Sequence, residues 1–376
     1  MPRYLYVSHG SPEGENTRTD FDAVASLALL QHTAMAKGFR YGRDFELDMI
    51  DYYSSGLDRL LQRRNTEILL ADIPPDVLLK PESGGRDGLR QRLEKLRAQK
   101  VILHFLDHHP VTRETRAIFE EFHRNGLIRS LWICPFCPEE DRVLDHTRKL
   151  CATEVTARFL ERVWNVPLDE TARRIMRWAH DQDFGLREIP EANRISVVIG
   201  ADYPPLKLAD CLSRGIFWNR ELAAVHSRQE EKTQRLLREL RYHWRRWRLA
   251  SGRRIDVVYA LMPPHHGLKV TAAGLHCLQN LHARVAVFLH RDPFLSIRIN
   301  PRENELHAGE MLRPFGGGGH RGAGSAGAGP HRPFPYRNVT DENFPRVAQT
   351  VDEQLSRLAR AESLPVTEGR ARKRPA

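Results

Sequence analysis

The sequence predicts an α/β protein in which a parallel-sheet N-terminal domain is joined by a helical connector to a smaller α/β C-terminal domain. Two observations lead to this fold class. Short apolar runs alternate with segments whose apolar residues recur at helical spacing, a pattern typical of strands that pair in parallel. The 376 residues also exceed the roughly 100–200 residues of a single domain. We therefore expect two domains.

The N-terminal half alternates strands and helices. The runs 67–73 (EILLADI) and 101–106 (VILHFL) are mostly apolar, as expected of strands covered on both faces of a parallel sheet. Further strands are expected at 4–8, 45–53 and 127–133, and helices at 22–36, 88–99, 112–125, 151–164 and 168–180.

The C-terminal half starts with a largely helical stretch over 204–242, followed by the run RYHWRRWR at 241–248. Strands are then expected at 255–261, 283–290 and 294–299, with helices at 270–282 and 341–360 and a glycine-rich stretch at 316–329. The resulting divisions are a domain over 1–200, a helical connector over 201–254, a domain over 255–362, and a basic tail over 363–376 that we expect to be disordered.

The composition is that of a globular protein with a positive excess. There are 58 Lys and Arg against 48 Asp and Glu, a formal net charge of +10. This indicates either a polyanionic partner or a solvated, Arg-rich surface. No apolar run reaches the roughly 18 residues of a membrane span. The first residues lack a secretory pattern and the five cysteines lack a disulfide spacing, so a cytoplasmic protein is expected.

Acids and histidines gather where the predicted strands end. His9 ends the first strand, Asp20 and Asp22 open the first helix, Asp72 ends the strand ILLAD, and Asp107, His108 and His109 follow VILHFL. Any one of these tips alone is better explained as a helix cap or a surface loop. Together they could converge, because ligands bind at the carboxyl ends of parallel strands. Carboxylates with imidazoles suit manganese or a similar divalent ion.

The order of the motifs resembles a known family. SHG, DFDAVASLALL, LLADIP, LDHHP, HDQDFG and FGGGGHRGAG resemble the successive motifs of the DHH phosphoesterase superfamily with its DHH-associated C-terminal domain, over about residues 1–330. The resemblance implies a divalent-metal-dependent phosphoesterase that uses metal-activated water. Its expected substrates are nucleotides or short single-stranded nucleic acid, and 1–200 would be the catalytic domain.

The resemblance also implies roles for single residues. One ion would be held by His9, Asp20 and Asp72, and the second by Asp22, Asp72, His108 and Asp181, with Asp183 as the alternative to Asp181. Two Mn²⁺ ions are expected, with Mg²⁺ or Co²⁺ possible. Asp107 would orient a histidine and His109 would face the substrate phosphate. One departure is the ten residues between His9 and Asp20, a longer gap than in the family. Either this loop bulges outward, or His9 is displaced and the site is weakened.

In the second domain the resemblance implies a substrate-binding site. Its expected residues are Arg298, Gly316, Gly317, Gly318, Gly319 and His320. Consecutive glycines leave backbone N–H groups open to a phosphate or base. The alternative is that the glycine run is a flexible linker.

Two other features keep two interpretations each. Cys134 and Cys137, with His146 and Cys151, could form a zinc site, although plain structural cysteines are the favoured interpretation because the spacing is unusual. The run RYHWRRWR could stack single-stranded bases on Trp244 or Trp247. It could equally be a helix whose aromatic residues pack inward, which is slightly favoured.

Two rival functions remain. The first is a cyclic dinucleotide phosphodiesterase of the same superfamily. The second is a nucleic-acid-binding protein that kept the fold and lost catalysis, which a displaced His9 would permit.

Overall fold

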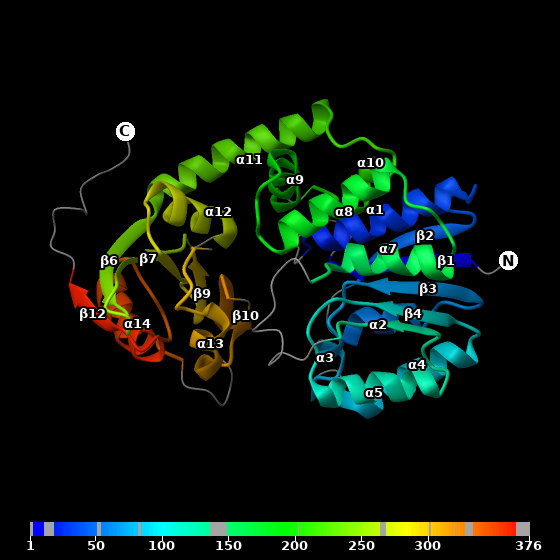
Figure 1. Ribbon diagram of the computed structural model, residues 1–376, viewed down its shortest axis with the longest axis horizontal. Coiled ribbons are helices and arrows are strands. Elements are labelled where there is room, and N and C mark those ends of the chain that lie inside the picture. The colour runs from blue at the N-terminus through cyan, green and yellow to red at the C-terminus, as the bar shows by residue number, and fades with distance from the viewer. Residues whose placement is uncertain are drawn as a thin grey trace. The chain divides into compact units, whose positions relative to one another are not determined.

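The chain forms two compact units, residues 1–229 and 230–376 (Figure 1). The computed structural model describes residues 3–10, 19–50, 54–81, 84–135, 149–201, 203–263, 268–300, 302–319, 321–327 and 334–365.

Unit 1 is built on a five-stranded sheet in which every pair is parallel. The strands are β1 (Arg3–His9), β2 (Phe45–Ile50), β3 (Thr66–Ala71), β4 (Ile102–Leu106) and β5 (Ser130–Trp132), in the order β2-β1-β3-β4-β5. The direction of winding reverses between β1 and β3. A crevice for ligands is expected at the carboxyl ends of strands at such a reversal.

Helices cover both faces of this sheet, as Figure 1 shows for α7 and α8 on one side and α4 and α5 on the other. The first layer holds α1 (Phe21–Ala36), α7 (Ala152–Val163), α8 (Glu170–Asp183), α9 (Pro190–Gly200) and α10 (Pro205–Ser213). The second holds α2 (Ser54–Leu60), α3 (Pro75–Leu78), α4 (Gly85–Ala98) and α5 (Arg113–Arg124). Nearly every residue of α1 is buried, because the surrounding helices enclose it against the sheet. The predicted α/β fold class is confirmed.

Unit 2 has a mixed seven-stranded sheet of order β10-β11-β9-β8-β7-β6-β12, in which only β7 and β8 pair in parallel. Its strands are β6 (Arg241–Arg248), β7 (Arg254–Leu261), β8 (Val285–Leu289), β9 (Phe294–Ile299), β10 (Gly318–Gly319), β11 (Ala323–Gly327) and β12 (Glu362–Pro365). The end of α11 (Arg220–Glu239), α12 (Val270–Leu275) and the π-helical turn His276–Asn280 pack on one face. On the other face lie α13 (Ala308–Leu312), the 3₁₀ turn Arg313–Phe315 and α14 (Phe344–Leu358).

The expected helical connector over 201–254 is corrected at its end, because 241–248 form strand β6 between β7 and β12. Trp247 is fully buried on the α14 face, where its indole N–H donates to Asp352 Oδ1 at 2.8 Å. Trp244 packs on the opposite face. The aromatic residues therefore pack inward as the favoured interpretation held, although from a strand and on two faces.

The C-terminal end also differs from expectation. Residues 363–365, placed by the sequence in a disordered tail, belong to β12, which pairs with β6. The rest of that tail lies outside the described residues. No helix in the described ranges combines the length and apolar character that crossing a membrane requires.

Candidate metal centre

The predicted acids and histidines lie along one edge of the unit 1 sheet. His9 is the last residue of β1, Asp72 directly follows β3, and Asp107, His108 and His109 directly follow β4. Since the strands are parallel, their carboxyl ends place these side chains at the same edge. The start of α1 adds Asp20 and Asp22, and the end of α8 adds Asp183.

The first group joins the end of β1 to the start of α1. His9 Nε2 lies 3.1 Å from Asp72 Oδ2 and 3.5 Å from Asp20 Oδ2. The other oxygen of Asp20 accepts the N–H of Ala23 at 3.0 Å and so caps α1. The long gap between His9 and Asp20 therefore does not displace His9.

Gly10 explains how the loop closes. A Cβ atom at Gly10 would lie 2.0 Å from the hydroxyl oxygen of Thr19, and the residue has a φ of +132°. Only glycine accommodates both the conformation and this close approach. The two described ends of the loop thus meet beside the acid cluster, whereas residues 11–18 lie outside the described residues.

The second group surrounds His108. Its Nε2 lies 3.4 Å from Asp72 Oδ1 and 3.8 Å from Asp22 Oδ2, and its Nδ1 lies 3.6 Å from Asp183 Oδ2. His108 itself is largely buried, with an 8% exposed side chain. Asp72 thus turns one oxygen toward His9 and the other toward His108. This gives the cluster a shared carboxylate at its centre.

The structure brings Asp183, rather than Asp181, to this cluster. The Asp181 carboxylate accepts the backbone N–H of Glu188 and the side-chain amide of Gln182, both at 2.7 Å. Residues two positions apart on a helix point in different directions. Asp181 and Asp183 therefore cannot both face His108. The expectation for Asp181 is corrected here: Asp183 occupies the position beside His108.

Asp72 has an unusual backbone. Its φ of +60° lies in the left-handed region, while its N–H still donates to the carbonyl of Leu106 at 3.0 Å. Asp tolerates this conformation better than most side chains do. In this conformation the carboxylate reaches both His9 and His108. Such backbone conformations concentrate at functional sites.

The carboxylates of the cluster oppose one another. Burial, followed by the charges of Asp72 and Asp183, raises the pKa of Asp22 to about 8. Burial, with the charges of Asp20 and Asp72, raises the pKa of Asp183 to about 6, although His108 counteracts this. For Asp72 burial acts in the same direction, but His9 and His108 outweigh it and lower its pKa. The cluster therefore holds more negative charge than its imidazoles balance.

The histidines show the complementary effect. Burial lowers the pKa of His9, but Asp20 and Asp72 outweigh it and raise the pKa to about 10. The pKa of His108 is likewise raised, against burial, by Asp183, Asp72 and Asp22. A divalent cation would replace these imidazolium protons as the counter-charge.

Asp107 and His109 form a separate pair. The buried Asp107 carboxylate accepts the backbone N–H of His109 at 2.8 Å, and its second oxygen lies 3.1 Å from His109 Nδ1. Burial lowers the pKa of His109, but Asp107 outweighs it and the net pKa is raised. His109 Nδ1 also lies 3.9 Å from Asp72 Oδ1. This residue is 30% exposed in its side chain, so it borders the cluster and is reachable from outside.

The donor set fits divalent metal ions. Three triplets have ligand atoms within 4.8 Å of one another: His9 with Asp20 and Asp72, Asp22 with His108 and Asp183, and Asp72 with His108 and His109. All donors are carboxylate oxygens or imidazole nitrogens, the ligands expected for Mn²⁺ rather than for a thiolate-bound metal. The nearby thiol of Cys151 stays protonated, because burial raises its pKa well above the usual value.

The glycine run of unit 2 belongs to a packed sheet edge. Gly318 pairs with Ser325 and Gly319 with Gly324, so β10 adds to β11. A Cβ atom at Gly317 would lie 2.3 Å from the carbonyl oxygen of Ser325. Gly316 ends the 3₁₀ turn in the left-handed conformation. These residues are therefore no flexible linker between elements, at least as far as residue 319.

Arg298 and His320 were expected beside this run. Arg298 lies on β9, paired with Ala323 of β11, and its stem packs against Gly274 of α12, where a Cβ atom would lie 2.8 Å from Arg298 Cγ. Its Nη1 donates to the carbonyl of Ile297 at 2.9 Å. His320 lies outside the described residues. Binding by this region stays a prediction.

No cysteine takes part in the metal-ligand groups found among the described residues. Cys134 is half-buried, and Cys151 is fully buried at the start of α7. Cys137 and His146, the other residues of the minor zinc hypothesis, lie outside the described residues.

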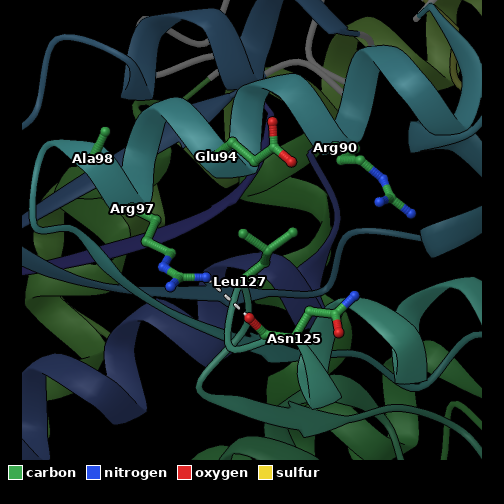
Figure 2. Close-up of a pocket in the computed structure, with 6 residues that line it drawn as sticks. All are labelled: Arg90, Glu94, Arg97, Ala98, Asn125 and Leu127. Carbon is green, nitrogen blue, oxygen red and sulfur yellow. Dashed lines mark hydrogen bonds between the residues drawn. The ribbon is translucent and has the colours of Figure 1, made fainter.

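A pocket elsewhere in unit 1 is lined by α4 and the turn after α5 (Figure 2). Its residues are Arg90, Glu94, Arg97, Ala98, Asn125 and Leu127. They directly precede β4 and β5, so the pocket lies at the amino ends of the strands, opposite to the acid cluster. Arg97 donates to the carbonyl of Asn125 at 3.0 Å, and Arg90 pairs with Glu121. The pocket is thus not part of the candidate metal centre.

Sequence reasoning missed one feature of the site. The start of α7 holds the carboxylate of Asp22 through Ala152 and Thr153. Nothing in the residues ATEV at 152–155 predicts that the first turn of this helix contacts a helix that lies 130 positions earlier in the chain.

Comparisons with known proteins give structural likeness only. No family model and no curated protein matches the chain. A pGpG-specific phosphodiesterase from Vibrio cholerae is similar over 94% of this chain and 99% of its own, at TM-score 0.50 and 11% identity. More distant are an exopolyphosphatase-related protein from Bacteroides fragilis (95% and 93% coverage, TM-score 0.44, 11% identity) and a putative family II inorganic pyrophosphatase from Methanococcus jannaschii (94% and 99%, TM-score 0.26, 12%). The likeness to the Vibrio cholerae enzyme extends over both units of the fold.

Proposed function

We propose that this protein is a divalent-metal-dependent phosphoesterase that hydrolyses phosphoester bonds in nucleotides or short single-stranded nucleic acid. One observation carries the proposal. Acids and imidazoles from β1, α1, β3, β4 and α8 converge at the carboxyl edge of a parallel sheet, around the shared carboxylate of Asp72. Converging groups with perturbed pKa values are typical of catalytic sites.

The ligand sets follow from the two groups. His9, Asp20 and Asp72 would hold one ion, and Asp22, Asp72, His108 and Asp183 the other, with Asp72 as the bridge. Mn²⁺ is the first candidate, and Mg²⁺ or Co²⁺ are alternatives. Two bound ions would lower the pKa of the attacking water and neutralise the charge that develops on the phosphoryl oxygens.

His109 would bind the substrate phosphate. Asp107 fixes the ring by accepting from both the backbone and the Nδ1 side of His109, so Nε2 is the ring nitrogen that would contact the phosphate. The raised pKa of His109 favours the protonated ring, which can donate to a phosphoryl or leaving-group oxygen. Asp107 is thus a positioning residue in this proposal, and His109 is the residue that touches substrate.

Unit 2 would hold the nucleotide. The expected contacts are Arg298, the backbone of Gly316, Gly317, Gly318 and Gly319, and His320. Short linear dinucleotides are the first substrates to test, because the similar Vibrio cholerae enzyme is specific for pGpG. The excess of basic residues is also compatible with an anionic substrate.

The test is hydrolysis by purified protein with Mn²⁺, followed by chromatography of the products. The panel contains pGpG, a cyclic dinucleotide, short single-stranded RNA and DNA, and adenosine bisphosphate. We expect turnover that EDTA and the Asp72→Asn variant both abolish. Tight binding of single strands with no turnover of any substrate would instead identify a nucleic-acid-binding protein. Preference for the cyclic dinucleotide would favour the other rival.

A further inference from the structure

The first turn of α7 forms hydrogen bonds to both oxygens of the Asp22 carboxylate. Its Oδ2 accepts the N–H of Ala152 at 2.6 Å, and its Oδ1 accepts the N–H of Thr153 at 2.9 Å. The hydroxyl of Thr153 donates to the same Oδ1 at 2.5 Å. An anion is favoured at this end of a helix, where backbone N–H groups have no partner within the helix.

This contact fixes which atom of Asp22 faces the cluster. Each carboxylate oxygen has two lone pairs, and the two donors from Thr153 use both on Oδ1. Among the described residues, Oδ2 accepts a hydrogen bond from Ala152 alone, and it is the oxygen that lies 3.8 Å from His108. Asp22 can therefore offer an ion one oxygen in one direction.

The hydroxyl of Thr153 has its own support. Ser26, one helical turn after Asp22 on α1, places its Oγ 3.2 Å from Thr153 Oγ1. Because Thr153 donates to Asp22, Ser26 supplies the hydrogen of this second bond. Ser26 and Thr153 are fully buried and Asp22 is 1% exposed. Solvent thus cannot replace a lost donor at little cost.

We propose that Thr153 is a positioning residue of the metal centre. Supported by Ser26 and by the start of α7, it would orient Asp22 so that only one carboxylate oxygen binds an ion. The proposal rests on the proposed function, since it assigns a role toward the same ions. Partners that orient metal ligands typically change metal affinity by 10–100-fold when they are removed.

The experiment compares Thr153→Val, which is nearly isosteric but lacks the hydroxyl, with Thr153→Ser, which keeps it. Thr156→Val is the matched control, because Thr156 lies on the same helix, is equally buried, and its hydroxyl forms no hydrogen bond within the described part of the chain. Mn²⁺ binding to each metal-free protein is followed by equilibrium dialysis and by the electron paramagnetic resonance spectrum of the bound ions. Circular dichroism and thermal unfolding verify that each variant is folded.

We expect Thr156→Val and Thr153→Ser to bind two ions, each with an affinity similar to that of the wild type. In Thr153→Val the ion that Asp22 would hold should bind at least about tenfold less tightly, with loss of the spectrum of paired ions. Equal binding by folded Thr153→Val and the wild type would overturn the proposal, as would an equal loss in Thr156→Val. Failure of the wild type to bind two ions would instead overturn the proposed function, and this inference with it. If Thr153→Val does not fold, Ser26→Ala, expected to weaken the same ion severalfold, decides in its place.

Discussion

At the scale of single residues, Asp72 is the most informative position. It lies beside both His9 and His108 and has a left-handed backbone conformation. Replacing it by Asn keeps the shape and tolerates the same φ, but removes the negative charge that the two proposed ions would share. We expect Asp72→Asn to lower kcat by at least about a hundredfold, or about 2.7 kcal/mol in activation free energy. Steady-state kinetics with Mn²⁺ measures this directly.

The matched comparison is Asp72→Ala, which also adds backbone strain of about 1–2 kcal/mol because Ala disfavours the left-handed region. Denaturant unfolding of the metal-free variants should therefore rank Asn above Ala. Activity of Asp72→Asn within about tenfold of the wild type would remove Asp72 from the role of bridge.

The raised pKa values predict how stability depends on pH. Asp22 and Asp183 titrate near 8 and 6 in the folded protein, above the range of an unfolded carboxylate. The folded state thus binds more protons than the unfolded state, and the metal-free protein loses stability as the pH rises through this window. Metal binding would displace those protons, so the affinity for metal should rise over the same interval.

Thermal unfolding at pH 5.5 and pH 8, with EDTA or Mn²⁺, tests both predicted pH dependences: the stability of the metal-free protein and the affinity for metal. The Tm without metal should fall toward pH 8, and the increase caused by Mn²⁺ should be larger at pH 8 than at pH 5.5. His9 acts in the same direction, since its pKa is also raised. A metal-free Tm that rises toward pH 8 would contradict the charge balance described for the cluster.

At the scale of secondary-structure elements, neighbouring glycines of the glycine run differ in how closely they are packed. A Cβ atom added at Gly317 would lie 2.3 Å from the carbonyl oxygen of Ser325 and 2.5 Å from Ala326 Cβ. A Cβ atom added at the neighbouring Gly318 would have no atom within 4 Å. We expect Gly317→Ala to lower stability by about 1–3 kcal/mol, as overpacking usually does. Gly318→Ala should stay within about 0.5 kcal/mol.

Urea unfolding followed by tryptophan fluorescence reports on this difference, because Trp247 is buried in the same unit. Equal stability of the two variants would mean that β10 does not pair with β11 as described.

The elements that sequence reasoning found are those with a strong local signal. The strands before Asp72 and before Asp107 are mostly apolar, and parallel pairing then places their ends together. The position of Asp183 could not be separated from that of Asp181, because helix phase decides it and both acids occur within three residues. The support of Asp22 by Thr153 was beyond reach, since it depends on how two distant helices meet.

Strand β6 shows a different limit. Its sequence RYHWRRWR carries four arginines, which suggested a solvated helix. In the structure Arg245 lies 3.1 Å from the buried Asp352, and Arg246 lies 2.7 Å from Asp256 of the neighbouring strand. Partners supplied by α14 and β7 let charged residues occupy a central strand. Tertiary contacts thus override the local propensity.

At the scale of the whole molecule, each unit has its own hydrophobic core and its own sheet. All residues of the metal-ligand groups found in the described chain belong to unit 1. Arg298 and the glycine run belong to unit 2. This distribution leads us to expect that metal chemistry and the recognition of the nucleotide can be separated by mutation.

The last prediction concerns Arg298. Arg298→Ala should raise KM at least about tenfold for a dinucleotide while the Mn²⁺ content per chain stays unchanged, because the variant removes a proposed substrate contact and no metal ligand. A small nitrophenyl phosphodiester, which has little nucleotide to bind, should lose much less. Arg346→Ala on α14 is the charge-matched control, since Arg346 is exposed and lies on the helix that covers the opposite face of the unit 2 sheet. Loss of metal in Arg298→Ala, or an equal fall with both substrates, would mean that Arg298 supports the metal centre or the core, and the division of roles between the two units would have to be abandoned.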